Sequence, residues 1–386
     1  MIILKKIKIV EYNRYHYELL PTWIQLISSF TPIDNICLFM YPGLARKGLS
    51  SFFSQLPNFR SIFVTDPSRG IVLRMLRLPI ALLLRGFIRF KGYPDINDQV
   101  FLKVRGPKKD LLVFNSIEPQ NLLKKAEFFA GKGYRIVVVL HNGNLIHNNS
   151  YRLFLQRPNV YVFVLSGMVK KYLQKAGFQK ANLFAPQYFN YKPRNDISER
   201  ISFAVQGSVF FDRRNYDSLI NAINFLVNRN NETNFLVKII GNSMTDHGKI
   251  IREEILKKQI EGFFVFFDYF LDYNEFYNEF DSCDYVLALQ DRMSIMYSPY
   301  FEYKCSSTIN QSLGFNKIAI LHEEQSILNG LEGISITYRD GQLAEAMSHA
   351  LKQPVEDREL MKAMIKERRK HLLKISRENV ERVLNE

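Results

Sequence analysis

The sequence predicts an α/β protein with two doubly wound, Rossmann-like domains that face a central cleft, and three observations lead to this fold class. Short runs rich in Val, Ile and Phe alternate with amphipathic segments, a pattern typical of a parallel sheet with helices on both faces. The alternation stops at Pro186–Arg200, where Pro, Asn and charged residues indicate a linker, and then resumes. The length of 386 residues suits two domains.

Taken in chain order, the apolar runs predict strands on both sides of the linker. Before it, strands are expected at Ile7–Glu11, Asn35–Phe39, Ser61–Val64, Leu111–Asn115, Arg135–Leu140 and Val160–Leu165. After it, they are expected at Ile201–Gln206, Asn234–Ile240, Phe263–Phe266, Tyr285–Leu289, Lys317–Leu321 and Ile334–Thr337. Because ligands bind at the carboxyl ends of parallel strands, the loops after these strands are the places to look for a site.

The pattern also predicts the domain boundaries. We expect an N-terminal domain over residues 1–190 and a C-terminal domain over residues 200–365. A long charged helix from about Glu356 to Leu384 ends the chain, and its last part, residues 366–386, is expected to pack back across the cleft. The apolar stripe predicted to contact the protein consists of Leu360, Met361, Met364, Leu372 and Leu373.

Positive charge is concentrated in the first half of the chain. Residues 1–193 contain 28 Lys and Arg against 9 Asp and Glu, a net charge of +19, whereas residues 194–386 contain 24 against 29, a net charge of −5. In Arg69–Tyr93, apolar residues alternate with arginines, and such a helix can lie in the interface of an anionic membrane. The alternative is a buried helix whose arginines reach out to water. The arginines expected to face the membrane are Arg74, Arg77, Arg85 and Arg89.

Other features bear on the compartment. No run reaches the roughly 20 uninterrupted apolar residues of a spanning helix, and the N-terminal MIILKKIKIV is too short in its apolar part for a signal peptide. The three cysteines are odd in number and lack metal-ligand spacing, which fits a reducing compartment. We therefore expect a cytoplasmic protein, peripheral at the inner face of the cell membrane, with no metal site.

The loop after the first strand of the second domain is a candidate phosphate site. Gly207 lets the backbone come close to a ligand, and Arg213 or Arg214 can form forked hydrogen bonds to phosphate oxygens at the start of the following helix. The alternative is an ordinary turn glycine followed by two solvated arginines.

A second candidate lies where Ser306, Ser307 and Thr308 open a predicted helix. Hydroxyl groups and free backbone N–H groups at a helix N-terminus bind anions, and Lys304 adds a full positive charge. A nucleoside diphosphate would fit there, although Ser306 or Ser307 could equally be a simple N-cap.

Two histidines are candidates for proton transfer. His141 follows the carboxyl end of a strand, and His16 lies in the loop after the first strand. With an ordinary pKa near 6.5, a histidine can exchange a proton near neutral pH. A lone histidine is more often structural, so this role stays a hypothesis.

The order of these pieces resembles the GT-B glycosyltransferases, and within them the group-1 (GT4-like) enzymes of bacterial capsule or O-antigen biosynthesis. Ile201–Leu226 is similar to the family's strand, glycine, basic residue, Asn and helix, and Tyr303–Leu321 is similar to the helix and strand that hold the donor. Val162–Phe178 is similar to the end of the acceptor domain. The donor-binding residues that the resemblance implies are Gly207, Arg213, Arg214, Asn215, Gly241, Lys304, Ser306, Ser307 and Thr308.

The chain also departs from the family's pattern. Many retaining members carry two glutamates eight residues apart, and the alignment of Lys317–Ile320 with the family's strand places Tyr303 and Gln311 at those positions. Glu302 is one residue away and could substitute for the first glutamate. An inverting enzyme would need a general base instead. The expected catalytic candidates are therefore His141, His16 and Glu302.

The predicted function is transfer of a hexose from a UDP- or GDP-linked sugar to a saccharide or a polyprenyl-diphosphate-linked saccharide in surface polysaccharide biosynthesis. The nucleotide-sugar is a substrate, and no separate cofactor is expected, because cationic side chains and a helix terminus can neutralise the diphosphate. The alternative is a catalytically inactive sugar-binding or scaffold protein of the same fold. A nucleic-acid binder could use the same basic half, but no reader motif is present, so no nucleic-acid partner is expected.

Overall fold

The structure is a computed structural model, and it describes residues 6–11, 17–40, 49, 52–53, 60–63, 110–118, 120–185 and 200–386. The chain divides into two compact units. Unit 1 comprises the described parts of Met1–Leu140, His147–Phe163 and Val380–Glu386, and unit 2 comprises His141–Ile146 and the described parts of Val164–Asn379. His16, the arginines predicted to face the membrane and most of the predicted linker lie outside the described residues.

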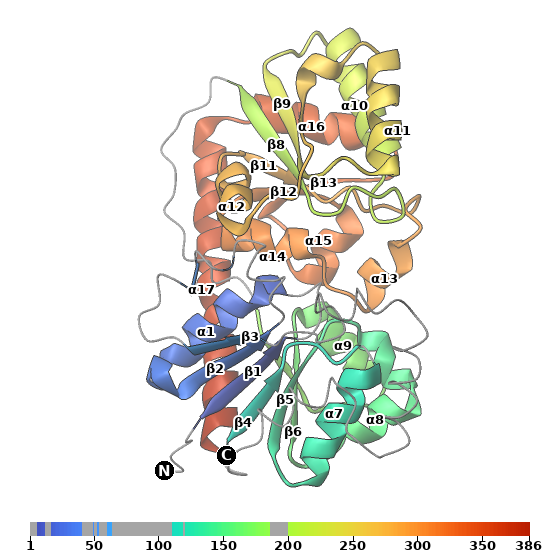
Figure 1. Cartoon of the computed structure of the whole chain (residues 1–386). Helices are drawn as coiled ribbons and strands as arrows, with labels where there is room; N and C mark the ends of the chain where they lie inside the picture. Colours follow the sequence, from blue (N-terminus) through green and yellow to red (C-terminus); the bar gives the residue numbers. More distant parts are fainter. Residues whose placement is uncertain are drawn as a thin grey trace, which may run out of the picture. The chain divides into compact units, whose positions relative to one another are not determined.

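The first sheet has seven strands in the order β3-β2-β1-β4-β5-β6-β7 (Figure 1). The strands are β1 (Ile7–Glu11), β2 (Ile36–Met40), β3 (Arg60–Phe63), β4 (Leu111–Phe114), β5 (Arg135–Leu140), β6 (Val160–Val164) and β7 (Ala181–Leu183). The pairs from β3 to β5 are parallel. Every residue of β1, β2 and β4 is buried, as in a sheet covered on both faces. The chain order reverses between β1 and β4, which makes this the topological switch point of the sheet.

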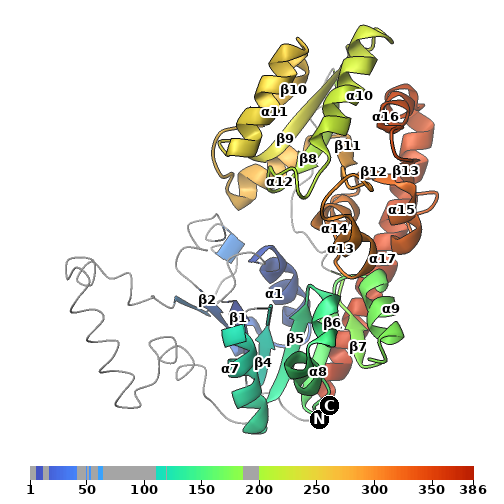
Figure 2. The ribbon, with the colours of Figure 1, turned by 90° about the vertical axis from the view of Figure 1, so that its right-hand side faces the viewer.

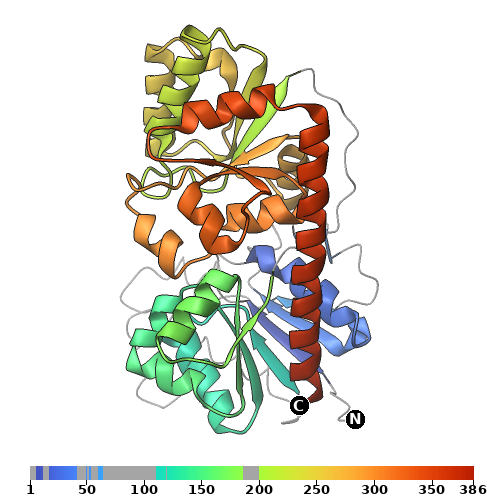
Figure 3. The same ribbon diagram turned by 180° about the vertical axis from the view of Figure 1, so that it is seen from behind.

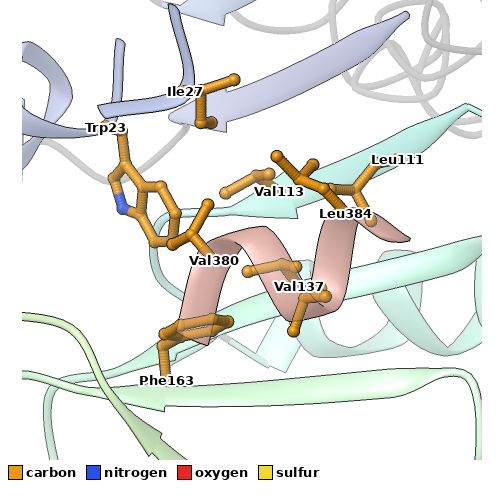
Figure 4. Close-up of a pocket in the computed structure, with 9 residues that line it drawn as sticks. Trp23, Ile27, Leu111, Val113, Val137, Phe163, Val380 and Leu384 are labelled. Carbon is orange, nitrogen blue, oxygen red and sulfur yellow. The ribbon is translucent and has the colours of Figure 1, made fainter. Parts of the chain in front are cut away.

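Helices cover both faces of this sheet. They are α1 (Leu20–Ser28), α7 (Gln120–Gly131) and α8 (Asn149–Leu155), with short 3-10 turns η1 (Tyr17–Leu19), η2 (Ile33–Asn35) and η5 (Gly143–His147), and α9 (Gly167–Lys175) precedes β7. Figure 2 shows α7 and α8 on one face, and Figure 3 shows α1 and the end of α17 (Val355–Asn385) on the other. There, Trp23, Val113, Val380 and Leu384 are among the apolar side chains that line a small cavity (Figure 4).

The second sheet has six strands in the order β10-β9-β8-β11-β12-β13, and all its pairs are parallel. The strands are β8 (Ile201–Gln206), β9 (Phe235–Asn242), β10 (Phe264–Phe267), β11 (Tyr285–Leu287), β12 (Ile318–His322) and β13 (Ser335–Tyr338). Its switch point lies between β8 and β11. Phe203 and Tyr285 from these two strands stack at the centre of the unit's core.

The helices of unit 2 begin at residues that favour helix starts. The described ones are α9, α10 (Tyr216–Asn228), α11 (Asp246–Lys257), α12 (Tyr273–Asp281), α13 (Tyr297–Glu302), α14 (Ser307–Gly314), α15 (Glu323–Asn329), α16 (Leu343–Lys352) and most of α17, with the 3-10 turn η6 (Glu261–Phe263). Asn215 and Thr245 cap α10 and α11 through their side-chain oxygens, and Asp272 forms a capping box with Glu275 at α12.

The predicted fold class is confirmed, and all twelve expected strands are present within two residues of their predicted ends. Among the strands of the described residues, only β7 was missed, because ANL is short and carries a polar residue. The stripe predicted on the last helix was partly wrong. Leu360 and Met364 are exposed, whereas Ile365 is buried and Met361 and Leu372 pack on the core. The buried line follows a spacing of three and four residues that starts at Met361, and Leu360 and Met364 lie one position off it.

Candidate functional site

Two glycines bring the ends of β8 and β9 close together in unit 2. Gly207 directly follows β8, has a φ of +99°, and donates its N–H to Ile240 O at 2.9 Å. A Cβ on Gly241 would lie 2.0 Å from the carbonyl oxygen of Gly207, closer than a real Cβ contact. Only glycine therefore allows this approach of the two backbones at Gly241, and only a residue tolerant of positive φ suits Gly207.

Arg214 places a buried positive charge beside the close approach of Gly207 and Gly241. Its side chain belongs to a residue that is only 6% exposed, and its Nη1 donates to Ser208 O at 3.1 Å while Nη2 donates to Gln206 O. In the described part of the chain no carboxylate forms an ion pair with it, and its Nε has no hydrogen-bond partner. The neighbouring Arg213 is exposed. Arg214 thus offers an anion a charge that the described protein groups leave uncompensated.

Gln206 connects this loop to the start of α14. It ends β8, is buried, and its Nε2 donates to Ser307 Oγ at 3.1 Å and to Thr308 Oγ1 at 2.9 Å. Ser306 occupies the N-cap position, but its side chain makes no capping hydrogen bond. Ser306 is therefore the N-cap residue, as the alternative interpretation expected, but its hydroxyl does not bond to the first backbone N–H groups of the helix. The start of α14 contacts the side-chain amide of Gln206, and Arg214 contacts its backbone carbonyl, so two predicted anion-binding elements meet at this one residue.

Asn215 and Asp291 fix the loop that carries Arg214. Asn215 Oδ1 accepts from Ser218 N at 2.9 Å, and its Nδ2 donates to both carboxylate oxygens of Asp291 at 3.1 and 2.9 Å. Asp291 is buried and follows β11. Sequence reasoning missed Asp291 and Gln206, although both are polar residues that come directly after an apolar run at the carboxyl edge of the sheet, and this signal could have found them.

The segment that begins with His141 lies in the same unit. Asn142 forms an isolated antiparallel bridge with Lys304, and Gly143 donates its N–H to Tyr303 O at 2.9 Å. His141 itself is 9% exposed. Asn142, which directly follows the predicted histidine, thus pairs with Lys304. Lys304 is half-buried and lies two residues before the N-cap of α14.

Glu302 and Gln311 occupy different environments. Glu302 is the last residue of α13, is exposed, and accepts from Ser298 Oγ at 2.7 Å. Gln311 is buried on α14, and its Oε1 has no hydrogen-bond partner. A neutral amide with an open acceptor therefore stands where the related pattern has a carboxylate.

Burial near α14 also affects two ionisable groups. Burial raises the pKa of the Cys305 thiol to about 11, against smaller opposing hydrogen bonds from Ser166 and Asn310. Burial, followed by the charges of Glu302 and Tyr303, raises the pKa of Tyr172. Both groups therefore stay protonated at neutral pH.

The described residues contain neither a cluster of side chains suited to a metal ion nor a helix suited to crossing a membrane. No group of three or more His, Cys, Asp and Glu side chains in this part of the chain could hold a metal ion. None of its helices has the length and apolar character needed to cross a membrane.

No protein-family model matches the sequence, and no curated protein matches it. Solved structures do resemble the whole chain. HepE of Anabaena, crystallised with UDP and glucose, has a TM-score of 0.66 at 11% identity over 99% of this chain and 100% of that chain. A UDP-forming trehalose-phosphate synthase of Burkholderia xenovorans gives 0.60 at 12% identity, covering 99% of each chain. A glycosyltransferase of Rickettsia africae gives 0.58 at 13% identity over 99% and 98%. The chain therefore has the GT-B fold of these proteins.

Proposed function

We propose that this chain, which has the GT-B fold, is a glycosyltransferase that binds a nucleotide-sugar donor in unit 2. The diphosphate of the donor would lie at the carboxyl ends of β8 and β11, between Arg214 and the start of α14. Arg213 and Lys304 would add positive charge at the rim of the same site. Cations and a helix terminus stabilise the negative charge that develops on a leaving diphosphate.

One observation carries the proposal. Gln206 contacts both the Arg214 guanidinium, through its carbonyl oxygen, and the hydroxyl groups of Ser307 and Thr308, through its side-chain amide. A buried cation with no carboxylate partner among the described residues and an uncapped helix start thus meet at one residue at the switch point of the sheet, where ligands of doubly wound sheets bind.

A UDP-linked sugar is the donor to test first. HepE was crystallised with UDP and with UDP-glucose, and the trehalose-phosphate synthases are described as UDP-forming. A GDP-linked sugar remains the competing donor, because the phosphate contacts proposed here do not read the base. We also propose that the reaction needs no metal ion and no further cofactor.

The proposed acceptor is inferred from the positive charge of the first half of the chain. The first 193 residues carry a net charge of +19, which would draw this half of the chain to an anionic membrane surface. We infer a saccharide acceptor attached to a polyprenyl diphosphate, and a role in cell-surface polysaccharide biosynthesis. His141 is the proposed proton-transfer group, with His16 and Glu302 as the other candidates.

A second candidate function is nucleotide-sugar binding without turnover. The observation that favours it is the absence of a carboxylate at Tyr303 and Gln311, the two positions where retaining relatives of the predicted family carry glutamates. Such a protein would bind UDP at Arg214 as tightly as an enzyme would, so binding alone does not separate the two functions.

Turnover separates them. Purified protein is incubated with a panel of UDP- and GDP-sugars and a bacterial lipid extract that contains polyprenyl-diphosphate saccharides, and release of the nucleoside diphosphate is measured. We expect one donor to be consumed only when the extract is present, and we expect His141→Ala to lower kcat at least tenfold while UDP affinity stays within about twofold. UDP binding with no release from any donor would favour the second candidate.

A further inference from the structure

The residues after His141 form a tight turn. Asn142 Oδ1 accepts from Asn144 N at 3.1 Å, and Asn142 O accepts from Leu145 N at 3.3 Å. The turn continues directly from the end of β5, so its position determines where His141 lies. Any group that holds the turn therefore also holds the imidazole.

Gly143 is the tightest point of this turn. Its N–H donates to Tyr303 O, and a Cβ added to it would lie 3.2 Å from Tyr172 Cδ1, 3.3 Å from Tyr303 O and 3.3 Å from Val169 Cγ1. Gly143 is not among the glycines with a positive φ, so alanine is permitted there by backbone conformation. The obstacle to a methyl group is contact alone, and it would push the turn away from Tyr303 by a few tenths of an ångström.

Tyr172 of α9 closes the turn from the other side. Its hydroxyl donates to Asn144 Oδ1 at 3.1 Å, and its ring lies 5.5 Å from the ring of Tyr303, tilted by 50°. Because burial raises its pKa, the phenol stays protonated and keeps donating across the neutral range. The turn is thus held by a backbone hydrogen bond, a side-chain hydrogen bond and close packing.

We propose that Gly143 and Tyr172 are positioning residues, which fix the Asn142–Asn144 turn against Tyr303 and Lys304 and thereby set the position of the His141 imidazole. The inference rests on the proposed function, because it takes His141 as the group that acts on the substrate. Neither residue touches the substrate. A misplacement of about 1 Å can lower the rate of such a reaction about 100-fold, so a shift of a few tenths of an ångström is expected to have a smaller, measurable effect.

The test compares Gly143→Ala with Gly167→Ala. Gly167 begins α9, the same helix that carries Tyr172, and a Cβ on it would meet nothing within 4 Å, so it is a matched control for adding a methyl group. We expect G143A to lower kcat about tenfold and to leave the Kd for UDP within about twofold. Y172F, which keeps the ring but loses the hydroxyl, should lower kcat by a smaller factor, and G167A should leave both constants unchanged.

Two readouts separate positioning from a general structural defect. In a double-mutant cycle under single-turnover conditions, G143A should have no further effect when His141 is already alanine. The NMR titration of the His141 imidazole should shift in G143A and stay unchanged in G167A. An equal loss of kcat in both backgrounds, or an unshifted imidazole titration, would overturn the proposal. When H141A has no measurable turnover, the imidazole titration decides. A wild-type protein that neither binds UDP nor transfers sugar defeats the proposed function instead, and the titration still reports whether Gly143 controls His141.

Discussion

The two sheets place opposite charges at equivalent corners. In the first sheet, Glu11 ends β1 beside the switch point, is fully buried, and its Oε2 accepts from Asn115 Nδ2 just after β4. In the second sheet, Gln206 ends β8 beside the switch point, and its carbonyl accepts from the buried Arg214. The first corner buries a carboxylate. The second buries a guanidinium, together with the Asp291 carboxylate that accepts from Asn215.

The difference favours one corner as the proposed diphosphate site. A buried carboxylate repels phosphate, whereas a buried guanidinium with no carboxylate partner among the described residues attracts it. The shared topology alone would make both switch points candidates, and the buried Arg214, which forms no ion pair with a carboxylate among the described residues, favours the second. Glu11 and Asn115 form the anionic corner. Gln206, Arg214 and the start of α14 form the cationic corner.

The largest expected effect is on the geometry of the cationic corner. Gly241→Ala places a methyl group against the Gly207 carbonyl, and such overpacking against backbone should cost about 3 kcal/mol. Gly262→Ala in the same unit meets nothing within 4 Å and should change stability by less than about 0.5 kcal/mol. Urea unfolding followed by far-UV circular dichroism measures both. A G241A protein as stable as G262A would mean that the two strands do not approach as described.

The next effect concerns the charge itself. Arg214→Ala should weaken UDP binding by about 2 kcal/mol, or about 30-fold, because it removes charge-assisted hydrogen bonds to the diphosphate. Arg213→Ala removes an exposed charge of the same sign one residue away and should weaken binding by no more than about threefold. Isothermal titration of UDP into each variant at fixed salt distinguishes them. Equal losses would show that only the general positive charge of the loop matters.

The anionic corner should affect stability and not UDP affinity. Asn115→Ala removes a donor from the buried Glu11 carboxylate and should cost about 1 to 3 kcal/mol. Trp23 is the sole tryptophan and lies in unit 1, so its fluorescence reports the unfolding of this unit selectively. Adding Glu11→Gln to N115A should recover part of the loss, because the buried charge is gone. A change in UDP affinity in N115A would contradict the assignment of the two corners.

The last prediction changes neither stability nor UDP affinity and reports how well water is excluded next to the cationic corner. Burial raises the pKa of Cys305 to about 11, so its thiol is almost fully protonated at pH 8 and the thiolate appears only as the pH rises toward 11. In a C37S/C283S variant, alkylation of Cys305 at pH 8 should be about 100-fold slower than for a free thiol of pKa near 8.5, and should accelerate about tenfold per pH unit. Rapid alkylation at pH 8 would mean that water reaches this position.

Much of the fold could be predicted from the sequence, because strands buried on both faces are continuous apolar runs. Ile7–Glu11, Arg135–Leu140 and Ile201–Gln206 form strands with the predicted bounds. The runs say little about β7, whose three residues contain Asn182, or about which face of α17 is buried. That face depends on the surface it meets, where Ile365 is buried and Met364 stays largely exposed.

The site was predictable in part. The sequence indicated Gly207, Arg214 and Ser306–Thr308 because of their residue types and positions. A glycine, an arginine and hydroxyl residues that all follow strands share few purely local structural roles. Gln206 and Asp291 were missed, since each looks like an ordinary polar residue until the neighbouring strand and helix are in place. Arg214 is buried while the adjacent Arg213 is exposed. This difference arises from tertiary packing, and the sequence of two identical neighbours does not show which of them is buried. The roles of all these residues, and those of His141, Glu302 and Lys304, stay predictions.

The most direct test of the central claim is a crystal structure of the protein with UDP. The account predicts diphosphate oxygens within about 3 Å of the Arg214 guanidinium and of the first backbone N–H groups of α14, with no phosphate at the corner formed by Glu11 and Asn115. A diphosphate bound away from Arg214 and α14, or against the anionic corner, would contradict it.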